Sequence, residues 1–415
     1  MKNYPRVLIV NLQSMDRKNA TGITLSSLWR DWPNDKLQEV SFEMISSNRG
    51  IEKVVARRGT LAKLMKSNIG NSLNGKVKNT TVNNSFKGSS WKSNLRQVGA
   101  AIYDCIPGKL KSLEWKQIRD FKPDIIYTLG GSVTALRLAN QISKRINVPL
   151  VIHFMDNWPE SIQWDANPYL GFYKSLLSKH LENAVNLSEG IITISPSMDM
   201  AYKKRFNKNS CILMNCVETD ALHCEPKNNN LTKKFVYTGG LHLDRWKALK
   251  DIACVLKKQC SGAFLEIYTN NNIESLKNEF NGLPVKFCKA IPHERIKEVL
   301  NEADVLVHAE SNAPELMGFF RYSISTKIPE YLSSGRPIIL YEPAELGLYK
   351  YIEDNNVGYV ASNVEELKCV INKVQVEDNV AMIDRALKLA QQNHSLENNN
   401  EKLRAFLTAC IVDKS

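Results

Sequence analysis

A lysine and a glutamate three residues apart stand in the stretch FRYSISTKIPEYLSSGRPIIL, residues 320–340. The pattern predicts a short helix that Ser325 or Thr326 caps and that ends at Gly335. Its first turn holds Lys327 and Glu330. A cation at a helix N-terminus opposes the helix dipole, so Lys327 is explained there if it binds an anion such as a phosphate. Glu330 shares its helix face, and a carboxylate at that spacing suits the paired hydroxyls of a ribose. An ordinary surface ion pair is the competing interpretation.

The run YTGGLHLDRWKAL supplies a second candidate for phosphate binding. Gly239 and Gly240 end an expected strand, where glycine lets the backbone approach a ligand closely. Arg245 comes near the start of the next helix, and its guanidinium can hold a phosphate through two parallel hydrogen bonds. The run lacks the G-x-G-x-x-G spacing, so the dinucleotide fingerprint is absent.

In the first half of the chain, polar residues follow two expected strands. Gly22 and Thr24 fall in a loop that opens a helix, where they could contact a phosphate or an acceptor; a plain helix cap explains them equally well. The run HFMDNWPES places Asp156 just after a buried strand, where it could contact an acceptor hydroxyl, and a helix cap is again the alternative. His153 lies two residues before Met155 on the same strand face and can be a core histidine.

Alternating strand and helix patterns must position these residues. The strand-like runs are apolar on both faces, as in a parallel sheet covered by helices. We expect strands at 6–12, 123–129, 149–155, 190–195 and 211–217, and then at 234–240, 264–270, 285–290, 304–310 and 337–343. The fold class is therefore α/β, with two Rossmann-like, doubly wound parallel sheets facing across a cleft. Ligands of such sheets bind beyond the carboxyl ends of the strands.

The length of 415 residues fits two domains. We expect the first at 1–226 and the second at 227–395, divided by the Pro- and Asn-rich run at 225–234, with a C-terminal helix at 396–415 that could pack back on the first. No apolar run approaches the roughly 18 residues of a membrane-spanning helix, and no secretory signal is apparent, so a cytoplasmic protein is expected. Nine cysteines without framework spacing favour reduced thiols, and no zinc site is expected.

Most of the formal charge of +12 lies in one segment. Residues 51–100 hold ten Lys or Arg and one acidic residue, and they are rich in Asn, Ser and Gly. A basic, flexible insertion with scattered apolar residues could rest on an anionic membrane surface. Nucleic acid would be attracted by the same charge. A solvated linker without a partner is the third interpretation.

Three runs of the second half carry a resemblance to a known family: YTGGL, IPHERIKEVLNEADVLVH and YSISTKIPEYLSSGRPIIL. They look like the C-terminal half of bacterial GT-B glycosyltransferases, above all the family-4-like enzymes of surface polysaccharide assembly, such as that of O-antigen, other lipopolysaccharide and capsule. The runs FKPDIIYTLG, VPLVIHFMDNWP and IITISPSMDMAYKKRF extend the resemblance to the first half. It covers most of the chain, and residues 51–100 match least.

The resemblance implies a nucleotide-sugar donor site in the second half. Lys327 and Arg245 would hold the donor diphosphate, and Glu330 the ribose. Further contacts would come from Gly239 and Gly240 after the first strand, Ser325 and Thr326 at the phosphates, and Tyr268, Ala290 and Ile291 at the base. Tyr322 stands where many family members carry the first glutamate of E-x7-E, and Gly240 stands where they carry arginine.

The implied reaction transfers a hexose-type sugar from the nucleotide sugar to a glycan, in particular a lipid-linked one, at the inner face of the cell membrane. No D-x-D run occurs, so neither a metal nor another cofactor is expected, and no nucleic-acid partner is expected. The resemblance favours retention of anomeric configuration; for an inverting enzyme, Asp156 would be the base. A nucleotide-sugar epimerase of the same architecture and a non-catalytic scaffold that binds nucleic acid or membrane through 51–100 are the alternatives.

Overall fold

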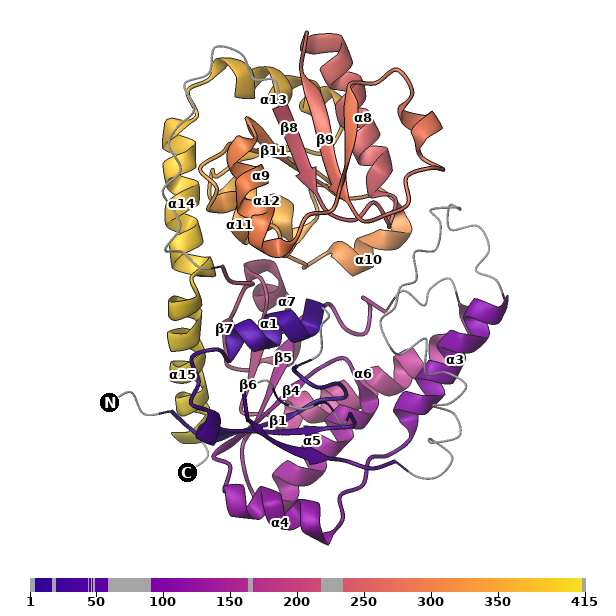
Figure 1. Cartoon of the computed structure of the whole chain (residues 1–415). Coiled ribbons are helices and arrows are strands. Elements are labelled where there is room, and N and C mark those ends of the chain that lie inside the picture. The colour runs from indigo at the N-terminus through magenta and orange to yellow at the C-terminus, as the bar shows by residue number, and fades with distance from the viewer. Residues whose placement is uncertain are drawn as a thin grey trace. The chain divides into compact units, whose positions relative to one another are not determined.

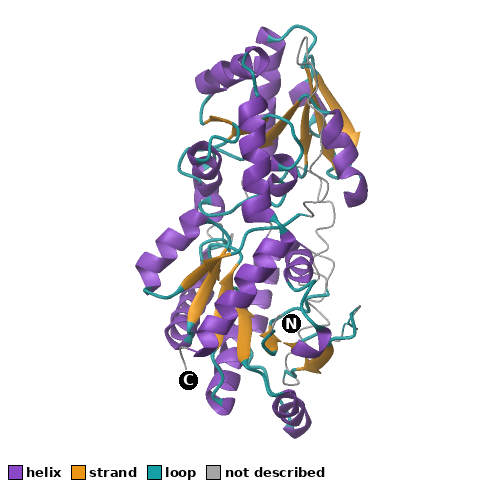
Figure 2. Cartoon of the chain, turned by 90° about the vertical axis from the view of Figure 1, so that its left-hand side faces the viewer, coloured by secondary structure: helices purple, strands orange, loops and turns teal. Residues whose placement is uncertain are grey.

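The computed structural model describes residues 4–16, 20–43, 45, 47, 49–58, 91–162, 167–217 and 234–412. The chain divides into two compact units (Figure 1). The described residues of the first unit fall within 4–216 and 396–412, and those of the second within 217–395. Helices flank the strands of each unit, as the colouring by secondary structure in Figure 2 shows.

A parallel sheet of seven strands forms the centre of the first unit, in the order β3-β2-β1-β4-β5-β6-β7. The strands are β1 (Val7–Val10), β2 (Leu37–Ser41), β3 (Glu52–Val55), β4 (Ile125–Leu129), β5 (Leu150–Phe154), β6 (Gly190–Thr193) and β7 (Ser210–Ile212). The helices are α1 (Ala20–Leu28), α3 (Trp91–Cys105), α4 (Ser112–Phe121), α5 (Val133–Ile146), α6 (Gly171–Leu187), α7 (Pro196–Phe206) and α15 (Leu396–Val412). Every residue of β1, β5 and β6 is buried, which is why these strands are apolar on both faces.

The C-terminal helix α15 packs on the first unit, beside β7 and α1. Its buried residues Leu403, Leu407 and Cys410 join the core that contains Val7 of β1. Positions 403, 407 and 410 recur at helical spacing, so they form one apolar stripe along α15. The first unit thus includes α15, although α15 follows the second unit in the sequence.

The second unit has a parallel sheet of six strands, in the order β10-β9-β8-β11-β12-β13. The strands are β8 (Lys234–Thr238), β9 (Phe264–Thr269), β10 (Val285–Lys289), β11 (Val305–Ala309), β12 (Ile338–Tyr341) and β13 (Tyr359–Ala361). The helices are α8 (Arg245–Gln259), α9 (Ile296–Glu302), α10 (Met317–Phe320), α11 (Ile328–Leu332), α12 (Gly347–Asp354), α13 (Val364–Val376) and α14 (Val380–His394).

In each unit the strand order reverses beside the first strand of that unit, between β1 and β4 and between β8 and β11. This is the 3-2-1-4-5-6 order of the Rossmann fold, so the prediction of two Rossmann-like parallel sheets is confirmed. Sheets of this kind bind ligands beyond the carboxyl ends of the two strands that flank the reversal. In the second unit these strands are β8 and β11.

Three strands, β2, β3 and β13, were not predicted. Strand β2 has the sequence LQEVS, and its polar residues Gln38 and Glu39 interrupt the apolar run that signals a buried strand. Both are buried, because Gln38 donates a hydrogen bond to Glu52 and Glu39 pairs with Lys53. Part of the basic segment 51–100 is therefore regular structure, in β3 and the first turns of α3; residues 59–90 lie outside the described part of the chain.

Candidate functional site

The site in the second unit lies where β8 and β11 end. Gly239 and Gly240 follow β8 directly, and Gly239 has a backbone φ of 142°, which favours glycine. The Gly239 N–H donates to the carbonyl oxygen of Tyr268 on β9 at 2.8 Å, and the Tyr237 hydroxyl donates to the Gly240 carbonyl at 2.8 Å. Glu310 follows β11. The turn after β8 is thus fixed from both sides by neighbouring groups.

Lys327 lies directly above this turn. The Tyr331 hydroxyl of α11 accepts a hydrogen bond from the Thr238 N–H at 3.1 Å, which ties α11 to the end of β8. As a result the Lys327 ammonium lies 4.2 Å from the centre of the Tyr237 ring. A methyl group added at Gly239 would lie only 2.7 Å from Lys327 Nζ. Glycine is therefore favoured by the backbone angle at position 239, and a Cβ there would displace the flexible end of Lys327.

The Lys327 ammonium has no hydrogen-bond or ion-pair partner among the described residues. Burial lowers the pKa of Lys327 to about 7; repulsion from Arg245 adds to this effect, while Glu310 and Glu330 oppose it. An anion bound beside Lys327 would raise that pKa again, because it would favour the charged form of the amine. The lysine is thus placed where a negatively charged ligand would stabilise it.

One feature predicted for this helix is wrong. We expected Ser325 or Thr326 to cap it, but α11 has only five residues and begins at Ile328, with Lys327 in the cap position and no capping hydrogen bond from its side chain. The Ser325 carbonyl oxygen instead accepts a hydrogen bond from the Ile328 N–H at 3.0 Å. Ser325 and Thr326 remain beside Lys327 in the chain, in the turn that precedes α11.

Arg245 is the first residue of α8, and it pairs with a carboxylate that the sequence analysis did not single out. Its Nε and Nη2 donate to the two oxygens of Glu310 at 2.6 and 2.9 Å. Its Nη1 lies 3.2 Å from Nε2 of His242, and its guanidinium lies 5.3 Å from the centre of the Phe320 ring. The bidentate pair joins the ends of β8 and β11, and it fixes the plane of the guanidinium.

Two more buried side chains, His308 and Glu342, lie close to Glu310. Nε2 of His308 is 3.5 Å from Glu310 Oε1 and 3.7 Å from Glu342 Oε2. Burial lowers the pKa of His308 to about 4, and burial together with repulsion from Glu310 raises the pKa of Glu342 well above its ordinary value. Burial would also raise the pKa of Glu310, but hydrogen bonding from His308 and the charge of Arg245 hold it at about 2.

The charges of this cluster follow from those pKa directions. At neutral pH His308 is neutral and Glu310 carries one negative charge, while burial disfavours the charged form of Glu342. Arg245 carries one positive charge, and a protonated Lys327 carries a second. Glu310 is already paired with Arg245, so the Lys327 ammonium, which Glu330 also attracts, keeps positive charge without an ion pair among the described residues. This cation is the electrostatic basis for binding an anion at the end of β8.

The other residues expected at a donor site lie at the same edge of this sheet. Tyr268 and Ala290 come from the neighbouring strands β9 and β10; the Ala290 N–H donates to the Thr269 carbonyl at 3.0 Å, and Ile291 follows it. The Tyr268 hydroxyl donates to Glu266 at 2.9 Å, so that hydroxyl is already bound within the protein. Glu330 is half-buried in α11, and Tyr322 is half-buried in the turn between α10 and α11.

In the first unit, Asp156 follows β5 and lies in a turn. No helix begins there, so the alternative interpretation as a helix cap is wrong. The carboxylate has no hydrogen-bond or ion-pair partner among the residues described, and burial raises the pKa of Asp156 to about 6. Next in the chain, the Asn157 side chain accepts from the Tyr202 hydroxyl at 3.0 Å, and the Trp158 ring packs on Gly131 after β4.

Two further expectations for the first unit concern His153 and the loop after β1. His153 is buried, its Nδ1 lies 2.6 Å from the Tyr127 hydroxyl, and burial lowers its pKa to about 3, as for a core histidine. Gly22 and Thr24 do not lie in a loop, because α1 already begins at Ala20. The Thr24 hydroxyl donates to the side chain of Asn215 at 3.3 Å, which connects α1 to the segment after β7.

Among the described residues, no group of three or more His, Cys, Asp or Glu side chains is arranged to hold a metal ion. A search of the same residues for a helix able to cross a bilayer also finds none.

The second unit matches a known protein family over most of its length. Residues 253–396 match the family model described as the C-terminal domain of glucosyltransferase 3-like proteins. Comparison with curated protein sequences gives no match.

Solved structures are similar to the whole chain. HepE of Anabaena, in complex with UDP, has a TM-score of 0.64 at 14% identity, covering 97% of this chain and 100% of that one. The lipopolysaccharide outer core galactosyltransferase WaaB has a TM-score of 0.62 at 12% identity, with 99% of each chain covered. Sucrose-phosphate synthase of Thermosynechococcus elongatus has a TM-score of 0.61 at 12% identity, with 100% of each covered. These likenesses show the GT-B fold, and with the matched domain they support a glycosyltransferase of the GT-B type.

Proposed function

We propose that the chain transfers a sugar from a nucleotide-sugar donor to a glycan acceptor, and that the second unit binds the donor. The observation that carries the proposal is the cation pair after β8, where Arg245 is held by Glu310 and Lys327 has no ion-pair partner among the described residues. The match of residues 253–396 to a glucosyltransferase domain supports it. HepE, which has the same fold, has been crystallised with UDP and with UDP and glucose, so UDP is the first nucleotide to test.

In this proposal the diphosphate lies between Lys327 and Nη1 of Arg245, the guanidinium nitrogen that does not donate to Glu310 and lies beside His242. Negative charge grows on the leaving nucleoside diphosphate as the sugar departs, and fixed cations at that position stabilise the transition state more than the ground state. Glu310 acts by holding the Arg245 guanidinium in one plane, so it is a positioning residue. Glu330 would bind the ribose, and Ser325 and Thr326 would contact the phosphates.

The rest of the donor would follow the edge of the sheet. Tyr268, Ala290 and Ile291 at the ends of β9 and β10 would border the base. Tyr322 and the glycine pair Gly239 and Gly240 would lie near the sugar and the phosphates. We propose that these contacts are sufficient without a metal or another cofactor, since charge on the diphosphate would be neutralised by the two cations.

Asp156 is the proposed polar contact to the acceptor hydroxyl in the first unit. Gly22 and Thr24 on α1 are proposed as further contacts to the donor phosphate or the acceptor. With a pKa of about 6, Asp156 is ionised at neutral pH and yet basic enough to accept a proton. In an inverting reaction it would be the general base. In a retaining reaction, which we propose from the family resemblance, the donor phosphate accepts the proton and Asp156 orients the hydroxyl.

The acceptor is proposed to be a lipid-linked glycan of bacterial surface polysaccharide synthesis. The basic segment 51–100 would hold the enzyme at the anionic inner face of the cell membrane, while the protein itself stays cytoplasmic.

A binding panel of UDP, GDP, dTDP and CMP tests the donor proposal directly. One nucleotide should raise the free energy of unfolding by about 2.7 kcal/mol at 100 times its dissociation constant. The matching nucleotide sugar, incubated with a glycan acceptor, should then release that nucleotide in proportion to the glycoside formed. The proposal fails if no nucleotide stabilises the protein. Conversion of the donor to an epimer without any transfer would instead identify an epimerase.

A further inference from the structure

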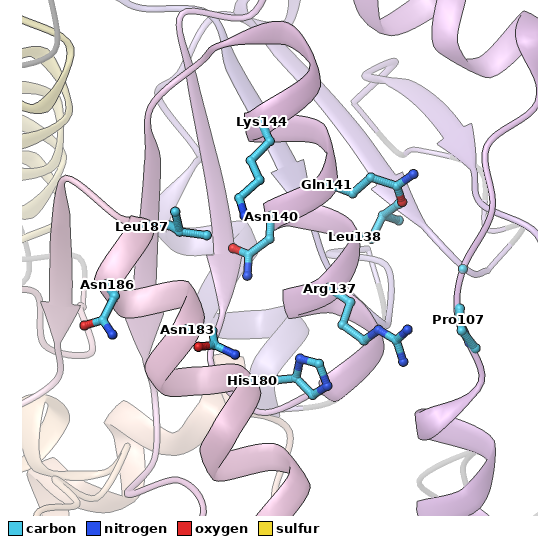
Figure 3. A pocket seen from close by; sticks show the side chains of 11 residues that line it. Pro107, Arg137, Leu138, Asn140, Gln141, Lys144, His180, Asn183, Asn186 and Leu187 are labelled. Carbon is cyan, nitrogen blue, oxygen red and sulfur yellow. The ribbon is translucent and has the colours of Figure 1, made fainter.

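The first unit contains a pocket of about 680 Å³ between α5 and α6, away from every residue assigned above (Figure 3). Arg137, Asn140 and Lys144 project from α5 toward His180 and Leu187 of α6, and the loop at 107–108 closes one side. The volume lies within the range of sites that bind small molecules, roughly 300–1,000 Å³.

Helical spacing explains why these side chains meet. Positions 137, 140 and 144 form one stripe of α5, and positions 180, 183 and 187 form one stripe of α6. The opposite stripe of α5 is apolar and packs into the core through Leu136, Ala139 and Ile142. The rotation of α5 about its axis is therefore fixed by the core, and its polar stripe, with Arg137 and Lys144 exposed, lies at the surface beside α6.

The start of α5 is fixed as well. The Ser132 side chain accepts from the Ala135 N–H at 3.1 Å, and the buried carboxylate of Asp104 accepts from the Ser132 hydroxyl at 2.6 Å and from the Val133 N–H at 2.7 Å. The Tyr173 hydroxyl of α6 donates to the same carboxylate at 2.6 Å. Asp104 thus ties α5 and α6 together at one end, and the pocket lies further along both helices.

The lining is cationic and rich in amides. It contains Arg137, Lys144 and His180 but no Asp or Glu, and its amide side chains are Asn140, Gln141, Asn183 and Asn186. Within the described part of the chain, neither Arg137 nor Lys144 has an ion-pair partner. The Oδ1 atom of Asn140 is buried without a hydrogen-bond partner there. A buried amide oxygen without a partner is rare, because it costs free energy unless a ligand or water binds it.

Lys144 alone could be explained by the last turn of α5, where a cation complements the helix dipole. Arg137 lies in the second turn of α5, where the dipole gives it no such role. His180 faces it from α6, close enough that the charge of Arg137 helps to lower the pKa of His180, after burial. Mutual repulsion of this kind is relieved when an anion binds between the two side chains.

We propose that this pocket is a separate binding site for a small acidic saccharide, a sugar that carries a phosphate, sulfate or carboxylate group. The guanidinium of Arg137 and the ammonium of Lys144 would bind the anionic group. The amides of Asn140 and Asn183 would bind ring hydroxyls, since an amide both donates and accepts hydrogen bonds. Leu187, 40% exposed at the rim, offers an apolar surface to the face of the ring.

The position in the fold separates this site from the proposed reaction. Helices α5 and α6 follow β4 and β5, so each runs back from the carboxyl edge of the sheet at which Asp156 lies. Residues 180–187 belong to the C-terminal half of α6, at the far end from that edge. The site therefore does not depend on the donor and acceptor assignments above, and its test uses binding alone.

Isothermal titration of the full chain with glucose 6-phosphate, glucose and inorganic phosphate tests the proposal. Glucose 6-phosphate should bind saturably and at least tenfold more tightly than either of the other two. The double substitution Arg137→Gln and Lys144→Gln should weaken its binding at least tenfold. The matched control Lys204→Gln and Lys297→Gln removes two exposed helix-surface cations elsewhere and should change the affinity less than twofold.

Each contrary result has a definite meaning. Equal losses in the two double variants would show general attraction to a basic protein and overturn the site. Equal affinity for inorganic phosphate would overturn the saccharide part, and no saturable binding would overturn the whole proposal. Because glucose 6-phosphate could also bind in place of a donor phosphate, Lys327→Met should leave its affinity unchanged. If both double variants bind phosphatidylglycerol vesicles equally well, the pocket is not a site for a lipid headgroup.

The pH dependence supplies an independent readout. The groups that face His180 are Arg137 of α5, Lys179 of α6 and Asp104 of α3, and the first two outweigh the third. A bound anion favours protonated His180, so affinity should rise as pH falls. Glucose 6-sulfate keeps one charge across this range, and its binding should tighten several-fold between pH 8 and pH 6. His180→Gln should abolish this change; a persistent change would exclude His180 from the site.

Discussion

At the carboxyl edge of the second sheet, Arg245 pairs with Glu310, and Lys327 lies nearby without an ion pair among the described residues. At the same edge of the first sheet, no cation of the described part of the chain pairs with Asp156, and burial raises its pKa to about 6. The two sheets share one strand order, so the difference comes from the side chains that follow the strands. A pair of cations suits a diphosphate, whereas a carboxylate of raised pKa suits an uncharged hydroxyl group.

Replacing Lys327 would remove the cation of the second sheet that lacks an anionic partner. Lys327→Met keeps the length of the side chain, and we expect turnover to fall by roughly 100-fold or more, the usual cost of losing one fixed donor at a developing charge. Affinity for the nucleoside diphosphate should fall as well. Steady-state kinetics and calorimetry measure both. Lys297→Met, at an exposed position of α9, is the control; if it behaves like Lys327→Met, the cation pair after β8 is not the donor site.

Breaking the ion pair between Glu310 and Arg245 tests how Arg245, the second cation at this edge of the sheet, is held in place. Glu310→Gln would leave a partly buried guanidinium without its anion, and we expect a loss of about 3 kcal/mol in the free energy of unfolding. Saturating nucleoside diphosphate should recover part of this loss, because a phosphate would take the place of the carboxylate.

The control for that prediction is an exposed pair of the same type, Arg295 and Glu298, whose Nε to Oε2 distance is 2.9 Å. Glu298→Gln should cost less than about 1 kcal/mol, since a solvated ion pair contributes little. Urea unfolding with and without ligand measures both variants. If the ligand stabilises Glu310→Gln no more than the unmodified protein, Arg245 does not contact the diphosphate.

Glu310 also shows how far the sequence leads. The strands flanking Gly239 and Asp156 were found because they are short apolar runs, and the search just after each strand then led to these residues. Glu310 is the last residue of the expected strand at 304–310, and this position at a carboxyl end is the signal that marks it as a candidate. Its pairing with Arg245 could not have been predicted, because the partners are 65 residues apart and meet only when β8 and β11 become neighbours.

Strand β2 and helix α11 mark two physical limits of sequence patterns. Buried Gln38 and Glu39 look like surface residues until their partners Glu52 and Lys53 are brought beside them by the sheet. In α11, a residue pattern typical of a capped helix gives only five helical residues, because Tyr331 is bound to Thr238 and fixes the segment through tertiary contacts. Local sequence patterns predicted the apolar strands that neighbour these two elements. They did not predict structure that depends on residues far apart in the chain.

Replacing Asp156, the carboxylate at the edge of the first sheet, should change the free energy of unfolding by an amount that depends on pH. Because the folded-state pKa of Asp156 is raised from 3.8 to about 6, the folded protein favours the protonated acid, and the stability that this provides is lost as pH rises through about 6. Asp156→Asn should therefore raise the free energy of unfolding at pH 8 and change it little at pH 4. Urea unfolding at the two pH values measures this; equal effects at both would contradict the raised pKa.

The same substitution should lower turnover, so function and stability oppose each other at this position. If Asp156 accepts a proton from the acceptor, kcat/KM of the unmodified protein should fall below a pH of about 6, and Asp156→Asn should remove that limb of the profile. An unchanged profile in the variant would restrict Asp156 to orienting the acceptor, as in a retaining reaction.

The smallest expected effect concerns the contact that places Lys327 over Gly239. Tyr331→Phe removes the hydroxyl that accepts from the Thr238 N–H at 3.1 Å, and a buried N–H left without a partner costs about 1–3 kcal/mol. Because the helix that carries Lys327 has only five residues, a small shift of α11 should move the ammonium and weaken diphosphate binding a few-fold. Tyr341→Phe removes a hydroxyl bound to Asp251 on the same sheet and should leave that affinity unchanged. If both variants bind the diphosphate equally well, α11 is held by its packing and not by this hydrogen bond. The second sheet would then position Lys327 no more specifically than the first sheet positions Asp156.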